Sequence, residues 1–362
     1  MAPGTLSRRA LNRATLDRQL LLRRASLPLL DAVEHLVGLQ AQTPHSWYHG
    51  LWCRLNDFDP DAFARLLVDR AVVRMALMRS TIHLVTAADC RWLRPLVQPV
   101  IERSTAGAFG KRLVGIDADK LIAAGRELLE DRPMIFSELG RALAERWPDR
   151  DPAALAQAVR AWVPLVQVPP RGVWGRSGRP AHTTIESWLG AGVDPAPSVD
   201  RLVLRYLAAF GPASVRDAQT WSGLTKLAEV FTRLDLVRFR DEDGRELFDL
   251  PDAPRPDPDT PAPPRFLYDF DNLLLSHDDR SRVLTAEAAA LRYAVANVLP
   301  GMLLVDGFTV GEWKLTGSTL TIRPYTRLSK KDKAAVTAEA ALLLEFAAAP
   351  GGDISRPPEW LS

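Results

Sequence analysis

The order of secondary-structure signals repeats in the middle of this 362-residue chain, and the repeat constrains the fold more than any other feature. Each copy begins with three helices, which we expect to start near Asp119, Ser137 and Asp151 in one copy and near Ser198, Ser214 and Thr225 in the other. Each copy then turns to short strands, at 165–168 with a hairpin of 173–174 and 181–185, and at 236–239 and 246–250. Three helices followed by a two-stranded wing are typical of a winged helix.

The remaining segments predict a fold of the α+β class with four units. The N-terminal unit fits the repeat less closely, with helices at about 14–24, 27–41 and 60–70 and strands at 72–78 and 81–85. After a proline-rich stretch, short apolar runs predict a small, barrel-like β domain that is closed by a helix from Ser329 to about Ala348. We therefore predict winged-helix domains at 1–108, 115–192 and 198–252 and a C-terminal β domain at 264–362.

The formal net charge of +2 conceals a segregation of charge along the chain. Residues 1–30 carry six arginines and one aspartate, a balance of +5, whereas residues 241–259 carry eight acids and two arginines, a balance of −6. A basic face can meet a polyanion, but a solvated surface is the commoner explanation for one cluster. Cys53 and Cys90 are isolated and form neither a metal motif nor a disulfide framework. With no signal peptide and no apolar run that could cross a bilayer, we expect a cytoplasmic protein that contacts no membrane.

Two glutamines, Gln40 and Gln42, lie where the pattern calls for apolar side chains. A helix predicted over 26–41 has a buried apolar stripe, and Gln40 continues that stripe. Pro44 favours an extended exit from the helix, in which Gln42 faces the same way as Gln40. A buried amide without partners costs about 1–3 kcal/mol, so both carboxamides need partners and are expected to converge. They either cap neighbouring backbone or form a site.

Other polar residues are candidates for DNA contact or metal binding. The hairpin of residues 171–185 carries arginines near its tip and small polar residues on its return strand, namely Arg176, Arg179, His182, Thr183 and Thr184. Such side chains suit phosphate and minor-groove contacts, although an ordinary solvated wing is the alternative. His45 and His49 are spaced to share a helix face, but no third ligand follows at a recognisable spacing, so we predict no metal site. His83 alternates as a strand residue and is expected to be structural.

The sequence resembles the winged-helix DNA-binding family that contains the AlkZ and YcaQ DNA glycosylases, over nearly the whole chain. Four motifs, which are specific together and weak alone, carry the resemblance: Gly38–Gln42, Arg79–Val85, His182–Ile185 and Asp271–Arg280. The resemblance implies three tandem winged helices and a C-terminal β domain in a concave, C-shaped DNA-binding scaffold, with no cofactor. The Gln-x-Gln form of Gln40 and Gln42 is similar to the AlkZ branch, whereas the YcaQ branch has aspartate at the second position.

The resemblance also implies a monofunctional glycosylase that hydrolyses the N-glycosidic bond of alkylated purines in double-stranded DNA. In AlkZ-like relatives the substrates include bulky adducts and interstrand crosslinks from genotoxic natural products, which implies DNA repair and self-resistance. The catalytic residues would be Gln40 and Gln42, and the hairpin would engage DNA. Glutamine cannot transfer a proton at neutral pH, but it can orient a water molecule. That suffices for a purine alkylated at N7 or N3, because such a cationic base leaves as a neutral molecule.

Nearby acids could stabilise positive charge on the sugar in the transition state, and the candidates are Asp269, Asp271, Asp278 and Asp279. Acids in such a turn more often pair with arginine and fix backbone, so no catalytic role is assigned to them.

A winged-helix transcription regulator without catalytic activity is the main alternative. It predicts sequence-specific binding without turnover and usually a dimer. Because three tandem units already supply an extended surface, we expect a monomer. A third possibility is a catalytically inactive scaffold that binds the DNA-damaging compound itself. Formation of abasic sites in alkylated duplex DNA would distinguish the glycosylase from both.

Overall fold

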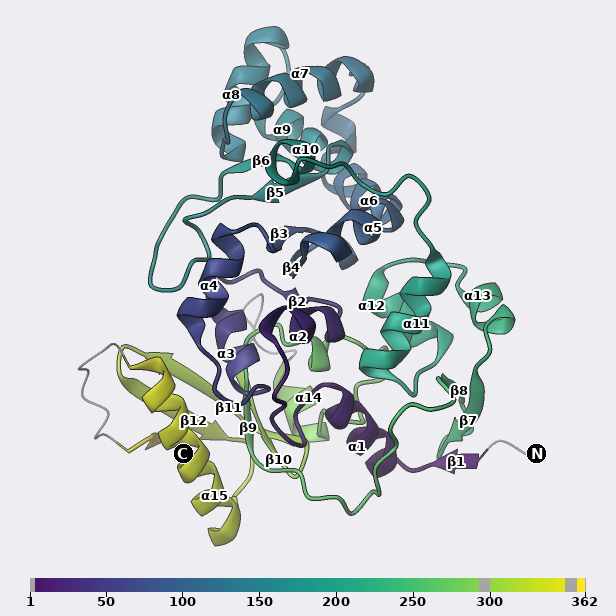
Figure 1. Cartoon of the computed structure of the whole chain (residues 1–362), viewed down its shortest axis with the longest axis vertical. Coiled ribbons are helices and arrows are strands. Elements are labelled where there is room, and N and C mark those ends of the chain that lie inside the picture. The colour runs from purple at the N-terminus through teal and green to yellow at the C-terminus, as the bar shows by residue number, and fades with distance from the viewer. Residues whose placement is uncertain (1–3, 293–299, 349–356, 362) are drawn as a thin grey trace.

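The computed structural model describes residues 4–292, 300–348 and 357–361 (Figure 1). Parts of the first and last predicted domains, residues 1–3, 293–299, 349–356 and 362, therefore lie outside the described residues. In the described ranges, helices and strands are mixed along the whole chain, as the α+β prediction requires. None of the helices in these ranges combines the length and the apolar character needed to cross a membrane.

The N-terminal region consists of short helices and a strand hairpin. Its elements are α1 (Arg8–Arg18), α2 (Leu29–His35), β2 (Leu39–Gln40), α3 (Ser46–Trp52), α4 (Pro60–Val68), β3 (Val72–Ala76) and β4 (Ile82–Thr86). The helix predicted over 26–41 is wrong at its C-terminal end, because α2 stops at His35. Val37 and Gly38 follow with φ of 53° and 82°, and this left-handed backbone cannot continue a helix. The chain then enters β2.

The next region contains the first copy of the repeat. Its elements are α5 (Ala87–Leu96), α6 (Gln98–Phe109), α7 (Ala118–Asp131), α8 (Phe136–Arg146), α9 (Pro152–Trp162), β5 (Leu165–Gln167), β6 (His182–Thr184) and α10 (Ile185–Leu189). The Asp151 side chain caps α9 at the predicted position. The predicted hairpin has a different first strand, because β5 pairs with β6 and residues 173–174 lie in the loop between them. Figure 1 shows this loop extending from the sheet toward α4.

The second copy follows the predicted order. It contains α11 (Val199–Phe210), α12 (Val215–Ser222), α13 (Ala228–Arg233), β7 (Val237–Asp241) and β8 (Glu246–Asp249). Ser198 and Ser214 cap α11 and α12 through their side chains, as their types and positions predict. β7 and β8 form an antiparallel hairpin, and β1 (Gly4–Leu6) pairs with β7 in parallel. The N-terminal strand therefore extends the hairpin of the second copy.

The strands of the first two regions form one sheet. Its order is β2-β4-β3-β5-β6, and β3 pairs with β5 across the two regions. β2 lies at one edge, where Leu39 is opposite Leu84 and Gln40 is opposite His83. The glutamine strand and the strand after the long loop therefore belong to a single rigid element.

The C-terminal region is a sheet covered by a long helix. Its strands are β9 (Arg265–Leu267), β10 (Gly301–Val305), β11 (Phe308–Thr316), β12 (Thr319–Pro324) and β13 (Glu359–Trp360), and its helices are α14 (Ala286–Arg292) and α15 (Lys330–Ala347). Ser329 caps α15, which confirms the predicted closing helix. The barrel prediction is wrong for the described strands, which form an open sheet with β13 and β9 at opposite edges.

Hydrophobic burial joins this sheet to the N-terminal region. Trp47 of α3 and Phe63 of α4 belong to the same buried cluster as Phe266, Leu303 and Leu343. Burying a large apolar side chain contributes about 1.5–3 kcal/mol, so this shared core holds the two ends of the chain together.

The segregated charges of the sequence also meet. Arg18 of α1 and Asp249 of β8 form an ion pair of 2.7 Å in which both side chains are buried, and Arg255 also binds Asp249. Arg9 lies 3.9 Å from Asp259. The basic N-terminal segment thus contacts the acidic 241–259 segment of its own chain.

Candidate active site

The strand that carries Gln40 is positioned by the left-handed turn before it. A Cβ on Gly38 would lie 2.4 Å from Val85 Cγ1 and 2.7 Å from the Leu84 carbonyl oxygen, so only glycine fits here. This close approach lets β2 pair with β4, and Ala41 then donates its N–H to the Ile82 carbonyl at 2.7 Å. Gln40 therefore reaches its position as a strand residue and not as the last turn of a helix.

The two glutamine carboxamides bind the β3–β4 hairpin, one at its turn and one at the first residue of β4. Arg79 Nη2 donates to Gln40 Oε1 at 2.6 Å, and the Ile82 N–H donates to Gln42 Oε1 at 2.9 Å. Gln40 is only 4% exposed, whereas Gln42 is exposed. The expectation that both amides find partners is confirmed, and one partner is a cross-strand backbone N–H.

The turn that receives these amides has an unusual backbone. Arg79 and Ser80 have φ of 56° and 62°, and the Thr81 N–H donates to the Met78 carbonyl at 3.1 Å. Two central residues with positive φ are the pattern of a type I′ hairpin turn, which normally contains glycine or asparagine. A non-glycine residue in this region costs about 1–3 kcal/mol, and such strain tends to collect at functional sites. Arg160 supports the turn by donating to the Ser80 carbonyl at 2.8 Å.

The Asp271–Arg280 motif supports the glutamine strand from the C-terminal region. Asn272 Nδ2 donates to the Gly38 carbonyl at 2.8 Å, two residues before Gln40. Asp271 accepts two hydrogen bonds from Arg54, at 2.7 and 2.9 Å, in a buried bidentate pair. The motif therefore has mainly a structural role, which is to hold the backbone before Gln40 in place.

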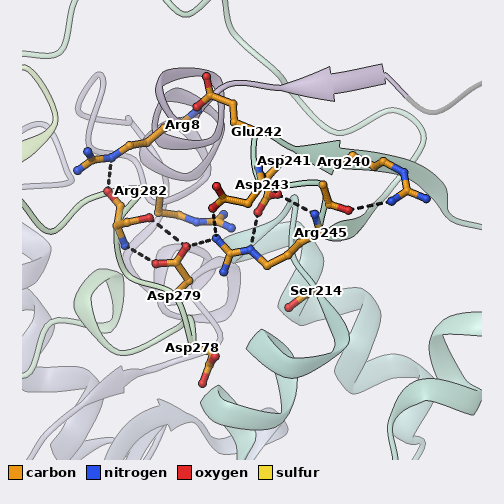
Figure 2. A network of polar contacts seen from close by, with 12 residues as sticks. Arg8, Ser214, Arg240, Asp241, Glu242, Asp243, Arg245, Asp278, Asp279 and Arg282 are labelled. Atoms are coloured by element: carbon orange, nitrogen blue, oxygen red, sulfur yellow. Dashed lines mark hydrogen bonds and ion pairs between the residues drawn. The ribbon is translucent and has the colours of Figure 1, made fainter.

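The other acids of this motif also have structural partners. Arg216 Nε lies 2.8 Å from Asp278, and Asp279 pairs with Arg245. Figure 2 shows Asp279 facing Arg245 within a network of acids and arginines. Burial alone would raise the pKa of Asp279, but hydrogen bonds from Ser281 and Arg245 outweigh it and lower that pKa. Asp269 lies two residues before the motif and is half-buried.

The 168–181 loop is held at Gly172 and Val173 by α3 and its N-cap residue His45. His45 Nε2 lies 3.0 Å from the Val173 carbonyl, and the Tyr48 hydroxyl donates to the Gly172 carbonyl at 2.9 Å. Arg176 and Arg179 are exposed, and Arg179 pairs with Glu138 of α8 at 2.9 Å. Across the described residues, neither arginine contacts Gln40 or Gln42. The loop and the glutamines are separate surfaces joined through α3.

The polar residues on the return strand face the interior. His182, Thr183 and Thr184 are 3%, 4% and 0% exposed. His182 stacks on Phe136 at 4.1 Å, Thr183 donates to the Leu129 carbonyl, and Thr184 caps α10. These contacts remove the three side chains from the set available for DNA, which leaves Arg176 and Arg179.

The two histidines proposed as possible metal ligands have other surroundings. His49 packs among the rings of Trp174, Trp313 and Phe346, and burial lowers its pKa to about 4. Burial also lowers the pKa of His45. Over the ranges that the structure describes, no three His, Cys, Asp or Glu side chains gather in a way that could hold a metal ion.

Sequence reasoning did not single out a set of arginines around the glutamine sheet. Burial lowers the pKa of each, to values of about 9 or 10 for three of them, and the set comprises Arg74, Arg79, Arg94 and Arg160. They donate to neutral oxygens, such as the Ala41 carbonyl for Arg74 and the Ala161 carbonyl for Arg94. Arg79 lies within a motif that carried the family resemblance, but its partner is far away in sequence.

Comparison with known proteins identifies the family. The sequence model of the family described as DNA glycosylase AlkZ-like matches residues 33–346. The chain belongs to the AlkZ-like DNA glycosylase family. An interstrand DNA cross-link repair glycosylase from Streptomyces sahachiroi is 25% identical over 358 residues, which covers 90% of this chain and 92% of the relative. The solved structure of the Streptomyces sahachiroi DNA glycosylase AlkZ has a TM-score of 0.79 and 22% identity, covering 99% of this AlkZ-like chain and all of the other.

These matches decide between the alternatives raised by the sequence. Membership of the AlkZ-like family supports a DNA glycosylase acting in DNA repair over a transcription regulator or an inactive scaffold. The structural likeness extends over almost the whole chain and supports the fold.

Proposed function

We propose that this AlkZ-like protein hydrolyses the N-glycosidic bond of cationic N7- or N3-alkylated purines in double-stranded DNA, with Gln40 and Gln42 as its catalytic residues. It acts as a monofunctional glycosylase, as a cytoplasmic monomer, and without a cofactor. The observation that carries the proposal is that two neutral carboxamides bind the same β3–β4 hairpin, Gln40 through Arg79 and Gln42 through Ile82. Among the described residues, no carboxylate is a hydrogen-bond partner of either amide.

The chemistry fits neutral amides only if the leaving group is already activated. Water attacks C1′ of the sugar, the C1′–N9 bond breaks, and the electron pair of that bond neutralises the positive charge of the alkylated base. The attacking water loses a proton to solvent, and an abasic site remains. Gln40 and Gln42 contribute by holding the water in line, which lowers the entropic part of the barrier. Protonation of the leaving group is unnecessary, so the usual pair of carboxylates is unnecessary too.

We further propose that the substrates include bulky N7 adducts and interstrand crosslinks left by genotoxic natural products, with a role in self-resistance. The Streptomyces relative is named as an interstrand cross-link repair glycosylase, which supports this choice. The exposure of Gln42 supports it as well, because a large lesion can approach an exposed residue without entering an enclosed pocket.

The DNA-binding part of the proposal uses the tandem organisation. The units at 1–108, 115–192 and 198–252 act as winged helices and form a concave, C-shaped scaffold with the C-terminal region. The three-helix-and-hairpin order of α7 to β6 and of α11 to β8 supports this assignment. Arg176 and Arg179 in the 168–181 loop contact phosphates, and their exposure supports that role.

The test of catalysis compares glutamine variants on a defined substrate. Gln40→Ala and Gln42→Ala are incubated with duplex DNA carrying N7-methylguanine, and free 7-methylguanine and abasic sites are measured under single-turnover conditions. We expect each variant to lose about 10-fold to 100-fold in rate, because positioning is lost. Gln167→Ala is the matched control, since it removes the same amide from the same sheet at β5. Parental rates for both glutamine variants would refute the proposal.

A second experiment tests the substrate range. The parent protein is given duplexes with a bulky N7 adduct or an N7–N7 interstrand crosslink, and strand separation is followed on denaturing gels after cleavage of abasic sites. Release of one strand from the crosslink is the expected result. Activity on N7-methylguanine without any activity on the crosslink would restrict the enzyme to small lesions.

A further inference from the structure

Arg79 bridges Gln40 to a helix of another region. Its guanidinium donates through Nη2 to Gln40 Oε1 at 2.6 Å and through Nη1 to the carbonyl oxygen of Trp221 in α12. Arg79 belongs to the β3–β4 turn, so this one side chain connects the turn, the glutamine strand and α12. The rotamer of Gln40 is therefore tied to two elements outside its own strand.

The chemistry of the donors fixes which way both amides point. A guanidinium and a backbone N–H can only donate hydrogen bonds, so each must face a carbonyl oxygen and not an amide nitrogen. Gln40 thus presents Oε1 to Arg79, and Gln42 presents Oε1 to Ile82. Among the described residues, no hydrogen bond is formed by Nε2 of either glutamine, which leaves these hydrogens and the second lone pair of Oε1 for water or substrate.

The partners of Arg79 are neutral. Over the residues that the structure describes, Arg79 hydrogen-bonds to an amide oxygen and a backbone carbonyl, and no carboxylate pairs with it. Burial lowers its pKa to about 10, so the guanidinium stays charged at neutral pH. A hydrogen bond from a charged donor is stronger and shorter than a neutral one, which suits a clamp on an amide.

We propose that Arg79 is a positioning residue of the glycosylase reaction, which holds the Gln40 carboxamide in its working rotamer and orientation. The inference rests on the proposed role of Gln40. Without Arg79, the Gln40 amide can rotate and exchange its oxygen and nitrogen, and the water that it holds loses its alignment with C1′.

The turn has a second support, which separates positioning from folding. Arg160 donates to the Ser80 carbonyl of the same turn, and over the described residues it forms no hydrogen bond with Gln40. Removing the Arg79 guanidinium therefore leaves the contacts of Arg160 with the turn in place. Arg94 offers a matched control, because it is a buried arginine of α5 that binds neutral oxygens of Gln98 and Ala161.

The experiment is a double-mutant cycle between Arg79 and Gln40 on duplex DNA with N7-methylguanine. Arg79→Met is expected to lower the single-turnover rate by about 10-fold to 100-fold, because misalignment of a positioned group costs this much. Arg79→Lys recovers part of the loss, since lysine still donates one hydrogen bond. In the double variant, Arg79→Met is expected to lower the rate of Gln40→Ala by no more than about twofold, because the effects of two groups that act as a unit are not additive.

Two further readouts separate this role from a structural or DNA-binding one. Arg94→Met is expected to keep the parental rate, and Arg79→Met is expected to keep the parental duplex affinity and its salt dependence. A parental rate for Arg79→Met would overturn the inference. So would a double variant, Arg79→Met with Gln40→Ala, whose rate loss equals the product of the losses in the two single variants. A reduced salt slope would also overturn it and would assign Arg79 to a phosphate contact.

The outcomes remain separable from those of the proposed function. If Gln40→Ala keeps the parental rate, the proposed catalytic role fails whatever Arg79 does. If Gln40→Ala is slow and Arg79→Met is not, only the inference about Arg79 fails. Should Arg79→Met not fold, as judged by its thermal unfolding, Arg79→Lys takes its place in the cycle, and additivity of its loss with that of Gln40→Ala would then count against positioning.

Discussion

Asn272 donates its side-chain amide to the carbonyl oxygen of Gly38 at 2.8 Å, although 234 positions separate the two residues. Gly38 is the left-handed residue that directs the chain into β2, and Gln40 follows two residues later. The C-terminal region therefore holds the backbone of the candidate active site at the point where its direction is set. This contact gives the Asp271–Arg280 motif a physical role in an enzyme whose proposed catalytic residues lie elsewhere.

Replacing Asn272 by alanine tests that role. The Gly38 carbonyl loses its donor, and an unsatisfied buried acceptor costs about 1–3 kcal/mol. We expect the free energy of unfolding in urea to fall by this amount and the glycosylase rate to fall with it. Asn56→Ala is the control, because Asn56 also donates to a backbone carbonyl but is exposed. Equal effects of the two substitutions would contradict a special role for Asn272.

Gly38→Ala tests the turn itself. The added Cβ meets Val85 and the Leu84 carbonyl at 2.4 and 2.7 Å, and the residue keeps a φ of 82°. Gly175 also has a positive φ, of 68°, but a Cβ there meets no atom of the described residues within 4 Å. We expect Gly175→Ala to cost about 1 kcal/mol for its backbone alone and Gly38→Ala to cost about 1–3 kcal/mol more, because of overpacking. Thermal unfolding of the two variants measures the difference.

Local signals predicted much of the secondary structure. Ser198, Ser214 and Ser329 cap helices at the expected positions because capping depends on residues within one turn. The end of α2 was predicted wrongly, because the apolar stripe continues through Val37 and outweighed the stop signal of Gly38. A glycine directly after a helical stripe was the signal that the sequence offered.

Long-range contacts set the rest of the candidate site. The amide partner of Gln40 is Arg79, 39 residues away, and no spacing rule connects a strand to a turn at that distance. Likewise, the DNA contact expected for Thr183 gives way to burial, because β6 pairs with β5 and Thr183 donates to the Leu129 carbonyl of α7. The sequence predicted that the two glutamines belong to the candidate site. The pairing of elements that are distant in the chain determined which side chains contact them.

The burial of His182 leads to a prediction about pH. Burial, followed by the positive charges of Arg160 and Arg74, lowers the pKa of His182 from 6.5 to about 3. Below about pH 6.5 the imidazole is protonated in the unfolded chain but stays neutral in the folded protein. The free energy of unfolding is therefore unaffected by this group above that pH and falls progressively below it. The loss is about 1.4 kcal/mol per pH unit, or about 2 kcal/mol between pH 6.5 and 5.

His182→Phe isolates this contribution. Phenylalanine keeps the stacking on Phe136, for which the rings lie 4.1 Å apart, and does not titrate. We expect the free energy of unfolding of the variant to fall less between pH 7 and pH 5 than that of the parent, by about 2 kcal/mol. Urea titrations at several pH values measure the two slopes, and identical slopes would show that His182 has the same pKa in the folded and unfolded states. Because the side chain faces the interior, duplex affinity should not change.

The exposed arginines of the 168–181 loop give the remaining prediction, on DNA binding. Replacing Arg176 and Arg179 by glutamate should weaken binding to undamaged duplex DNA and lower the slope of log affinity against log salt by up to about 1.8, since each phosphate contact contributes about 0.9. The pair that Arg179 forms with Glu138 is partly exposed, so its loss should cost at most about 1 kcal/mol of stability.

Arg146→Glu is the charge-matched control for this experiment, because Arg146 is an exposed arginine at the end of α8 that pairs with Glu127. It should leave the salt slope unchanged, whereas a slope that is the same in the loop variant and the parent would show that the loop does not contact phosphates. The single-turnover rate at saturating protein separates binding from chemistry, since the loop arginines make no contact with Gln40 or Gln42 in the described residues. We expect that rate to stay at the parental value, so that the loop contributes affinity and the glutamine strand contributes turnover.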